Sequence, residues 1–201
     1  MGVNAAGLFV GLTNRATAAR NDKARSRGLL VLDALARPDA AAVAEDMTRE
    51  SGGNLAGYNP FHLLAADGRS AHLTVFSEGA AETRTLAPGA HVVCNRDPAD
   101  PASSKVGAIR RALDGIDPGQ PLPALFEALC RLLGSHPNPS NPLENPCVHT
   151  DAYGTRSSTV LALGRQRWRW WHAEGAPCET KYGNFTRLLD QLRESPSVRI
   201  P

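Results

Sequence analysis

The pattern of hydrophobic and polar residues predicts a chain that alternates between short strands and pairs of helices. Strands are indicated by short apolar runs with turn residues between them. These runs are residues 3–4, 8–14, 59–66, 71–76, 82–86, 90–95, 160–163 and 166–171. Helices are indicated where apolar residues recur every three or four positions. These segments are residues 27–35, 40–50, 105–114, 122–133 and 185–193.

Turn and cap residues support these boundaries. Ser26 is the candidate N-cap of the first helix, Pro38-Asp39 begins the second, and Asp67-Gly68 is a typical hairpin turn. Four prolines between 135 and 146 exclude regular structure there. Because groups of strands alternate with helices, the sequence predicts a single α+β domain over residues 1–201, with two sheets covered by helices in four αββα layers.

Composition and charge narrow the function classes. The 201 residues are 42% hydrophobic and 21% charged, as in an ordinary globular protein, and the net charge is +2. That charge is too small to predict nucleic acid or a membrane surface as a partner. No apolar run is long enough for a membrane span, and we find no signal pattern at the start, so we expect a cytoplasmic location.

The strand predicted at 166–171 alternates arginine with tryptophan. Basic residues interleaved with aromatic ones can bind single-stranded nucleic acid through stacking. Only one strand has this pattern, so we interpret the tryptophans as core residues and the arginines as solvated.

The four cysteines, at 94, 130, 147 and 178, lie far apart and form no Cys-x-x-Cys pair. Cys147-Val148-His149 places two candidate metal ligands close together but lacks a second pair. We therefore predict no metal site and no cofactor, with reduced thiols in or near the core. No glycine-rich phosphate-binding motif occurs either.

One stretch combines an arginine with hydroxyl side chains just before a strand. Arg156 follows Tyr153-Gly154-Thr155 and precedes Ser157, and the strand at 160–163 comes next. A guanidinium at a strand end presents several donors to a ligand, which makes Tyr153, Thr155 and Ser157 candidate substrate-binding residues around it. The alternatives are a solvated turn whose hydroxyls cap their own backbone, or an ion pair of Arg156 with Asp151.

Four blocks, in order, resemble the family named for its Asn-Arg-Asp-Glu motif, the NRDE or transport-and-Golgi-organisation family. They are Gly-Val-Asn-Ala-Ala-Gly-Leu-Phe-Val-Gly-Leu-Thr-Asn-Arg at 2–15, Ser-Arg-Gly at 26–28, Tyr-Asn-Pro-Phe-His-Leu at 58–63 and Tyr-Gly-Thr-Arg-Ser-Ser-Thr at 153–159. Family members carry a further amino-terminal strand that begins Met-Cys, and then the Asn-Arg-Asp-Glu motif. This sequence has neither, so we expect a family member that lacks its first strand.

The family is similar in outline to N-terminal-nucleophile hydrolases, in particular cysteine amidohydrolases that cleave linear amides. In those enzymes the thiol of the first residue attacks the amide, asparagines supply oxyanion donors, and an arginine stabilises the charged centre. The resemblance implies these roles for Asn14, Asn95 and Arg156, with the nucleophile absent. Asparagine at a strand end is also a common turn former, so each of the two has a purely structural alternative.

Two functions follow as expectations. The first is an amidohydrolase-like protein that binds a small molecule. We expect this sequence to have no hydrolase activity, because the amino-terminal cysteine is absent. The second is a non-enzymatic carrier of a haem- or lipid-like ligand. Five histidines are candidate axial ligands, although a histidine in an apolar strand is more often a hydrogen-bonded core residue. They are His62, His72, His91, His149 and His172.

Overall fold

The computed structural model describes residues 1–16, 20–50, 53–96, 104–164 and 167–194, which form two compact units. Of these residues, the first unit contains 1–89, 93–96 and 192–194, and the second contains 90–92 and 104–191. The single domain expected over the whole chain stays a prediction, and each unit is described by itself.

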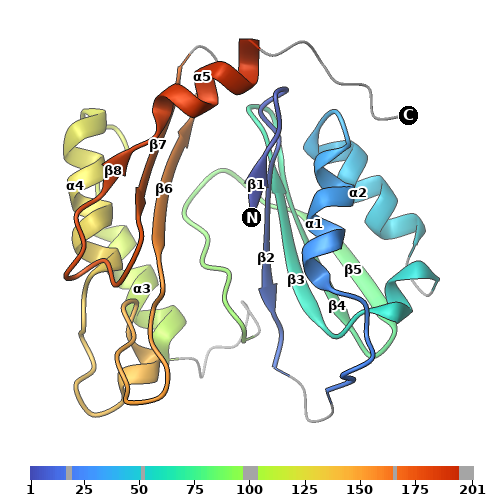
Figure 1. Ribbon diagram of the computed structural model, residues 1–201, viewed down its shortest axis with the longest axis horizontal. Helices are drawn as coiled ribbons and strands as arrows, with labels where there is room; N and C mark the ends of the chain where they lie inside the picture. Colours follow the sequence, from blue (N-terminus) through green and yellow to red (C-terminus); the bar gives the residue numbers. More distant parts are fainter. Residues whose placement is uncertain (17–19, 51–52, 97–103, 165–166, 195–201) are drawn as a thin grey trace. The chain divides into compact units, whose positions relative to one another are not determined.

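The first unit is built on a five-stranded antiparallel sheet in which the strands follow chain order (Figure 1). The strands are β1 Gly2–Val3, β2 Phe9–Asn14, β3 Phe61–Ala66, β4 Ala71–Ser77 and β5 Ala80–Thr85. The β3–β4 hairpin turns at Asp67, as predicted. Its carboxylate accepts hydrogen bonds from the backbone N–H groups of Arg69, Ser70 and Ala40.

Two helices cover one face of this sheet: α1 Arg27–Leu35 and α2 Ala40–Arg49 (Figure 1). The predicted N-cap Ser26 is confirmed, since it accepts from Gly28 N–H. Asp39, where the second helix was expected to begin, caps that helix by accepting from Ala42 N–H. A short 3-10 helix, η1 Asn54–Gly57, leads into β3. The buried residues between helices and sheet are Leu8, Val10, Leu30, Val31, Ala34, Ala40, Val43, Met47, Leu55, Tyr58, Phe61, Leu63, Ala65 and Phe76.

The strand predicted at 90–95 is wrong, because these residues pair with no other strand. The carbonyl oxygen of Cys94 instead accepts a hydrogen bond from the Thr13 hydroxyl and one from the His62 ring. These two side chains take the place of a partner strand as its hydrogen-bond donors. The meander ends at β5, which is joined to β4 by a tight turn at Glu78-Gly79. Both turn residues have positive φ, 52° and 81°, as a two-residue hairpin turn that matches the twist of the strands requires.

The second unit contains a three-stranded antiparallel sheet of β6 Ser158–Leu163, β7 Trp168–Ala173 and β8 Gly183–Asn184. The helices α3 Ser104–Asp114 and α4 Leu122–Leu133 lie on one side of it (Figure 1). Another 3-10 helix, η2 Pro142–Glu144, interrupts the proline-rich segment, and α5 Thr186–Glu194 follows β8.

The tryptophans of β7 take part in packing, as predicted. Trp168 is buried, and Trp171 stacks on Phe126 of α4 with ring centroids 4.5 Å apart. Trp170 lies 5.3 Å from the Phe185 ring. Arg167 is exposed and Arg169 half-buried, whereas residue 166 lies outside the described residues.

The α+β class with antiparallel sheets is confirmed by the helices and strands of both units. The stacking of four layers depends on how the two units are placed, and it stays a prediction. No helix in the described part of the chain has the length and apolar character needed to cross a membrane.

Candidate functional site

Asn14 and Asn95 lie at the same end of the sheet in the first unit. Asn14 is the last residue of β2, and the hydroxyl of the preceding residue, Thr13, donates to the Cys94 carbonyl oxygen at 3.0 Å. On the other side, Ala16 N–H donates to the Asn95 carbonyl oxygen at 3.0 Å. These two bonds hold residues 14 and 95 close together although most of the first unit separates them in sequence.

His62 supports this arrangement from within the sheet. It is fully buried on β3, opposite Thr13, and its Nδ1 lies 2.7 Å from the Cys94 carbonyl oxygen. Because a carbonyl oxygen only accepts, Nδ1 carries the hydrogen in this bond. The backbone before Asn95 is therefore fixed by two donors, Thr13 and His62, while the two asparagines themselves are exposed.

The second group of predicted residues lies in the second unit, on a small hairpin before β6. Val148 and Thr155 pair through two bonds, one from Thr155 N–H to the Val148 carbonyl and one from Val148 N–H to the Thr155 hydroxyl, both 2.9 Å. The hydroxyl of Thr155 thus serves the hairpin. Tyr153 is exposed beyond it and shares two hydrogen bonds with the Thr150 hydroxyl.

Arg156 and Ser157 follow this hairpin and are both exposed. Among the residues that the structure describes, Arg156 forms no ion pair, with Asp151 or any other acid, and no side-chain hydrogen bond. The guanidinium is thus available to a ligand. Its participation in one site with the asparagines of the first unit stays a prediction.

Beside this hairpin, four metal-ligating side chains gather within the second unit. The ligand atoms of His136, Cys147, His149 and Cys178 all lie within 4.8 Å of one another. Cys147 Sγ is 3.4 Å from His149 Nε2 and 3.7 Å from Cys178 Sγ, and His149 Nε2 is 3.0 Å from Cys178 Sγ. The expectation of no metal site rested on the lack of a second ligand pair, and His136 and Cys178 form that pair.

The backbone brings the three segments of this cluster together. Cys147 N–H donates to the Ser135 carbonyl oxygen at 3.3 Å, which places the residue after α4 beside the start of the hairpin. A Cβ on Gly134 would lie 3.3 Å from Cys178 Cα, a tight contact that shows how closely the end of α4 approaches the segment of Cys178. Cys178 is exposed, but partial desolvation by its neighbours, and then the Cys147 thiol, raise its pKa.

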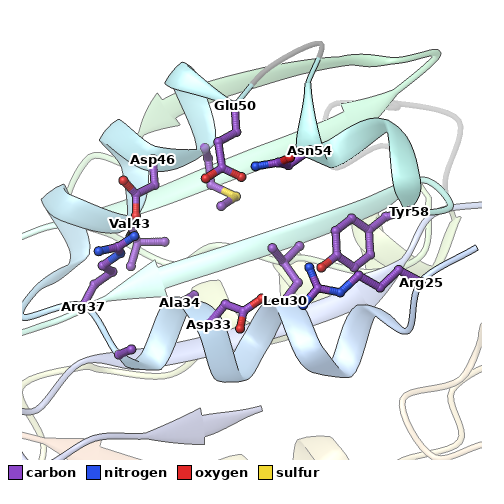
Figure 2. A pocket seen from close by; sticks show the side chains of 12 residues that line it. Arg25, Leu30, Asp33, Ala34, Arg37, Val43, Asp46, Glu50, Asn54 and Tyr58 are labelled. Carbon is purple, nitrogen blue, oxygen red and sulfur yellow. Dashed lines mark hydrogen bonds and ion pairs between the residues drawn. The ribbon is translucent and has the colours of Figure 1, made fainter. Parts of the chain in front are cut away.

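A pocket of about 380 Å³ lies in the first unit beside α1, α2 and η1. Its apolar lining includes Leu30, Val43 and Met47, and its charged residues include Asp33 and Arg25 (Figure 2). The remaining lining residues are Ala34, Ala36, Arg37, Asp46, Glu50, Asn54 and Tyr58.

The hydroxyl of Tyr58 in this pocket is buried, and it has no hydrogen-bond partner among the described residues. Burial raises the pKa of Tyr58 above its usual value, and the Arg25 guanidinium, 5.5 Å from the ring centroid, acts in the opposite direction. A neutral phenol can donate or accept a hydrogen bond, and because this oxygen is buried, a bound molecule would reach it only after neighbouring side chains move.

The candidate haem ligands are mostly occupied by hydrogen bonds. His72 contacts the hydroxyls of Ser70 and Thr85, and His172 lies between Thr159 and Glu174. His62 and His149 belong to the networks described above. None of the residues lining the pocket near Tyr58 is a histidine.

A sequence model of the family described as Transport and Golgi organisation 2 matches residues 1–174. The chain belongs to this family. The match confirms the family that the four sequence blocks indicate, and it spans Asn14, Asn95 and Arg156. No curated protein matches the chain in sequence.

Two features of this Transport and Golgi organisation 2 family member were missed in the sequence. The partners of Cys147 and His149 lie 11 and 31 residues from Cys147, a spacing that no short metal motif uses. Nothing in the sequence indicates that the Tyr58 hydroxyl is buried without a hydrogen-bond partner, because a tyrosine before a strand is usually just a packing residue. Cys178 lies beyond the residues that the family model matches, so the match does not include the complete cluster.

Proposed function

We propose that this Transport and Golgi organisation 2 family member has a fold like that of the N-terminal-nucleophile hydrolases and binds a small molecule with an amide or acyl carbonyl. The observation that carries the proposal is the pair of bonds, from Thr13 and Ala16, that holds Asn14 and Asn95 at one end of one sheet. Side-chain amides are suitable donors to a carbonyl oxygen. Their exposure leaves them accessible to such a molecule.

This proposal assigns no catalytic nucleophile to any of the four cysteines in this sequence. Nucleophilic thiols of this hydrolase class belong to the first residue, whose free amine removes the thiol proton. All four cysteines of this chain are internal. Cys94 adjoins Asn95, but its nitrogen is an amide and cannot act as that base.

Binding can be tested by ligand-detected NMR with N-octanoylglycine, a linear amide, as the probe. The loss of one neutral hydrogen bond costs about 1 kcal/mol, so Asn14→Ala and Asn95→Ala should each weaken binding about five-fold. Asn141→Ala is the matched control, because Asn141 is an exposed asparagine of the second unit whose side chain caps nothing. Arg156→Ala in the same assay tests whether that residue takes part.

Equal affinity in wild type and both asparagine variants would overturn the proposed binding site. Hydrolysis of the probe by the wild-type chain that is lost in Asn95→Ala would contradict the absence of a nucleophile among these cysteines. The two results are independent, since binding and product are measured separately.

A carrier function is the second candidate, and the buried hydroxyl of Tyr58 favours it. The pocket combines apolar residues such as Leu30, Val43 and Met47 with charged residues and the Tyr58 hydroxyl. This mixed lining suits an amphipathic ligand with an apolar body and a polar head group, as in a lipid. The absence of histidine from the lining argues against haem ligation in this pocket.

Tyr58→Phe separates this function from the first. Because the hydroxyl has no partner among the described residues, its removal should leave the free energy of unfolding unchanged or raise it by up to about 1 kcal/mol. The same change should weaken the binding of a fluorescent fatty acid. A variant that is destabilised and binds the fatty acid as the wild type does would contradict the carrier function. A haem titration without a shift of the Soret band would count against haem as the ligand.

A further inference from the structure

We propose that His136, Cys147, His149 and Cys178 bind one Zn²⁺ ion in a structural site of the second unit. This site is separate from the small-molecule binding proposed above, and neither depends on the other.

Two distances among the ligand atoms match tetrahedral zinc, and all four atoms lie within 4.8 Å of one another, so side-chain rotations can bring the rest to the tetrahedral values. With Zn–S bonds of about 2.3 Å and Zn–N bonds of about 2.05 Å, a tetrahedron places two sulfurs about 3.8 Å apart and a sulfur about 3.6 Å from a nitrogen. The Cys147 and Cys178 sulfurs are 3.7 Å apart, and Cys147 Sγ is 3.4 Å from His149 Nε2. His149 Nε2 and Cys178 Sγ are 3.0 Å apart, so they must separate by about 0.6 Å to reach the tetrahedral distance. The His149 ring is exposed and can rotate to allow this.

The chemistry of the ligands selects zinc. Two thiolates and two imidazoles in a tetrahedral arrangement are typical of Zn²⁺, whereas Mg²⁺ and Ca²⁺ require oxygen ligands. Two thiolates also neutralise the charge of the ion. Four protein ligands complete the coordination, which is the mark of a structural rather than a catalytic zinc site.

The ligands come from three segments that lie far apart in sequence. His136 follows α4, Cys147 and His149 lie on the hairpin before β6, and Cys178 lies between β7 and β8. Cys147 is fully buried, and the other three ligands are exposed. A zinc ion there would close the proline-rich loop after α4 and fix the hairpin that precedes Arg156.

A disulfide between Cys147 and Cys178 is the competing interpretation. Its sulfurs would be bonded at about 2.05 Å, whereas here both thiols are free and 3.7 Å apart. A disulfide would also leave His136 and His149 without a role. The two interpretations therefore differ in whether the histidines matter.

The test uses the untagged full chain, purified under reducing conditions. We expect one zinc per chain by elemental analysis. Added Co²⁺ should give a sulfur-to-cobalt charge-transfer band and the intense visible bands of tetrahedral cobalt. Cys147→Ser, Cys178→Ser and His149→Ala should each weaken Zn²⁺ binding by more than the roughly 10- to 100-fold that the loss of an outer-shell partner costs.

Cys130→Ser is the matched control, because Cys130 is a half-buried thiol of the same unit outside the cluster. It should bind zinc like the wild type. His136→Ala and His149→Ala keep the test valid if Cys147→Ser fails to fold, since both histidines are exposed. Zinc below one-tenth per chain with no cobalt bands, or equal zinc affinity in His149→Ala and Cys130→Ser, would overturn the proposal.

Discussion

The two units differ in how much core they contain. In the first unit, fourteen buried residues form one core cluster between the five-stranded sheet and the helices α1 and α2. In the second unit, the twelve-residue helix α4 has no buried residue at all. The buried hydrophobic residues that the structure describes in the second unit are Val106, Cys147, Val148, Val160, Trp168, Ala173 and Leu189.

Because of this difference, we expect the second unit to depend more than the first on stabilisation other than a hydrophobic core. Each buried aliphatic or aromatic side chain contributes about 1.5–3 kcal/mol, so burial contributes more to the stability of the first unit than to that of the second. Small units with insufficient cores are commonly held by disulfides or metal ions. The Cys–His cluster lies in the unit with the smaller core, and we regard the two facts as connected.

Removing one phenyl ring from each unit should sharpen the comparison, with the largest effect in the first. Phe61 is fully buried and stacks on Phe76, so Phe61→Ala should lower the free energy of unfolding by about 3–5 kcal/mol. Phe126 is only half-buried against Trp171, and Phe126→Ala should cost about 1–2 kcal/mol. Urea unfolding followed by circular dichroism measures both. A larger loss in Phe126→Ala would contradict the ranking of the two cores.

Asn145→Ala should lower the free energy of unfolding by less than Phe61→Ala does, and only in the second unit. Its buried side chain closes the proline-rich loop, since Oδ1 accepts from Asn138 N–H and Nδ2 donates to the Asn138 carbonyl oxygen. Removal leaves two backbone groups without these partners and should cost about 1–3 kcal/mol. All three tryptophans lie on β7, so their fluorescence reports this unit selectively. Asn141→Ala, the control, should change the stability by less than about 0.5 kcal/mol.

The smallest effect concerns Asp67 in the first unit and depends on pH. Burial alone would raise the pKa of Asp67, but three backbone N–H donors outweigh it and lower the pKa. A lowered pKa in the folded state adds stability above the unfolded value of about 3.9, and this stability is lost as the pH falls through the folded pKa. Asp67→Asn should therefore cost about 1 kcal/mol at neutral pH and almost nothing in acid.

Urea unfolding at the two pH values, followed by circular dichroism, checks this prediction. Asp151→Asn serves as the control, because Asp151 is exposed in the other unit. A cost for Asp67→Asn that is the same at both pH values would exclude a contribution from the charge.

Sequence reasoning worked where the signal was local. Ser26 caps its helix by a bond to the residue two positions ahead, the second helix begins after Asp39 as expected, and Asp67 closes its own hairpin turn. Such contacts require only neighbours in the chain, so residue type and spacing are enough to predict them.

Prediction failed where the partner lies far away in sequence. Residues 90–95 have the apolar pattern of a strand, but the Cys94 carbonyl bonds Thr13 and His62, which no local pattern reveals. Cys147 and His149 are adjacent enough to be noticed, whereas Cys178 joins them only through the fold. For the site, the sequence identified Asn14 and Asn95 through the family resemblance, and the structure places their backbones together at one sheet end.

The most direct test of the dependence of the second unit on zinc is hydrogen exchange with and without a chelator. It is followed by mass spectrometry on untagged chain whose zinc content has been measured. Zinc removal should sharply accelerate exchange in peptides from β6 and β7, while peptides from β2 and β3 keep their protection. Readdition of Zn²⁺ should restore the protection in wild type and not in His149→Ala. Unchanged exchange in β6 and β7 after zinc removal, or equal acceleration in both units, would contradict this account.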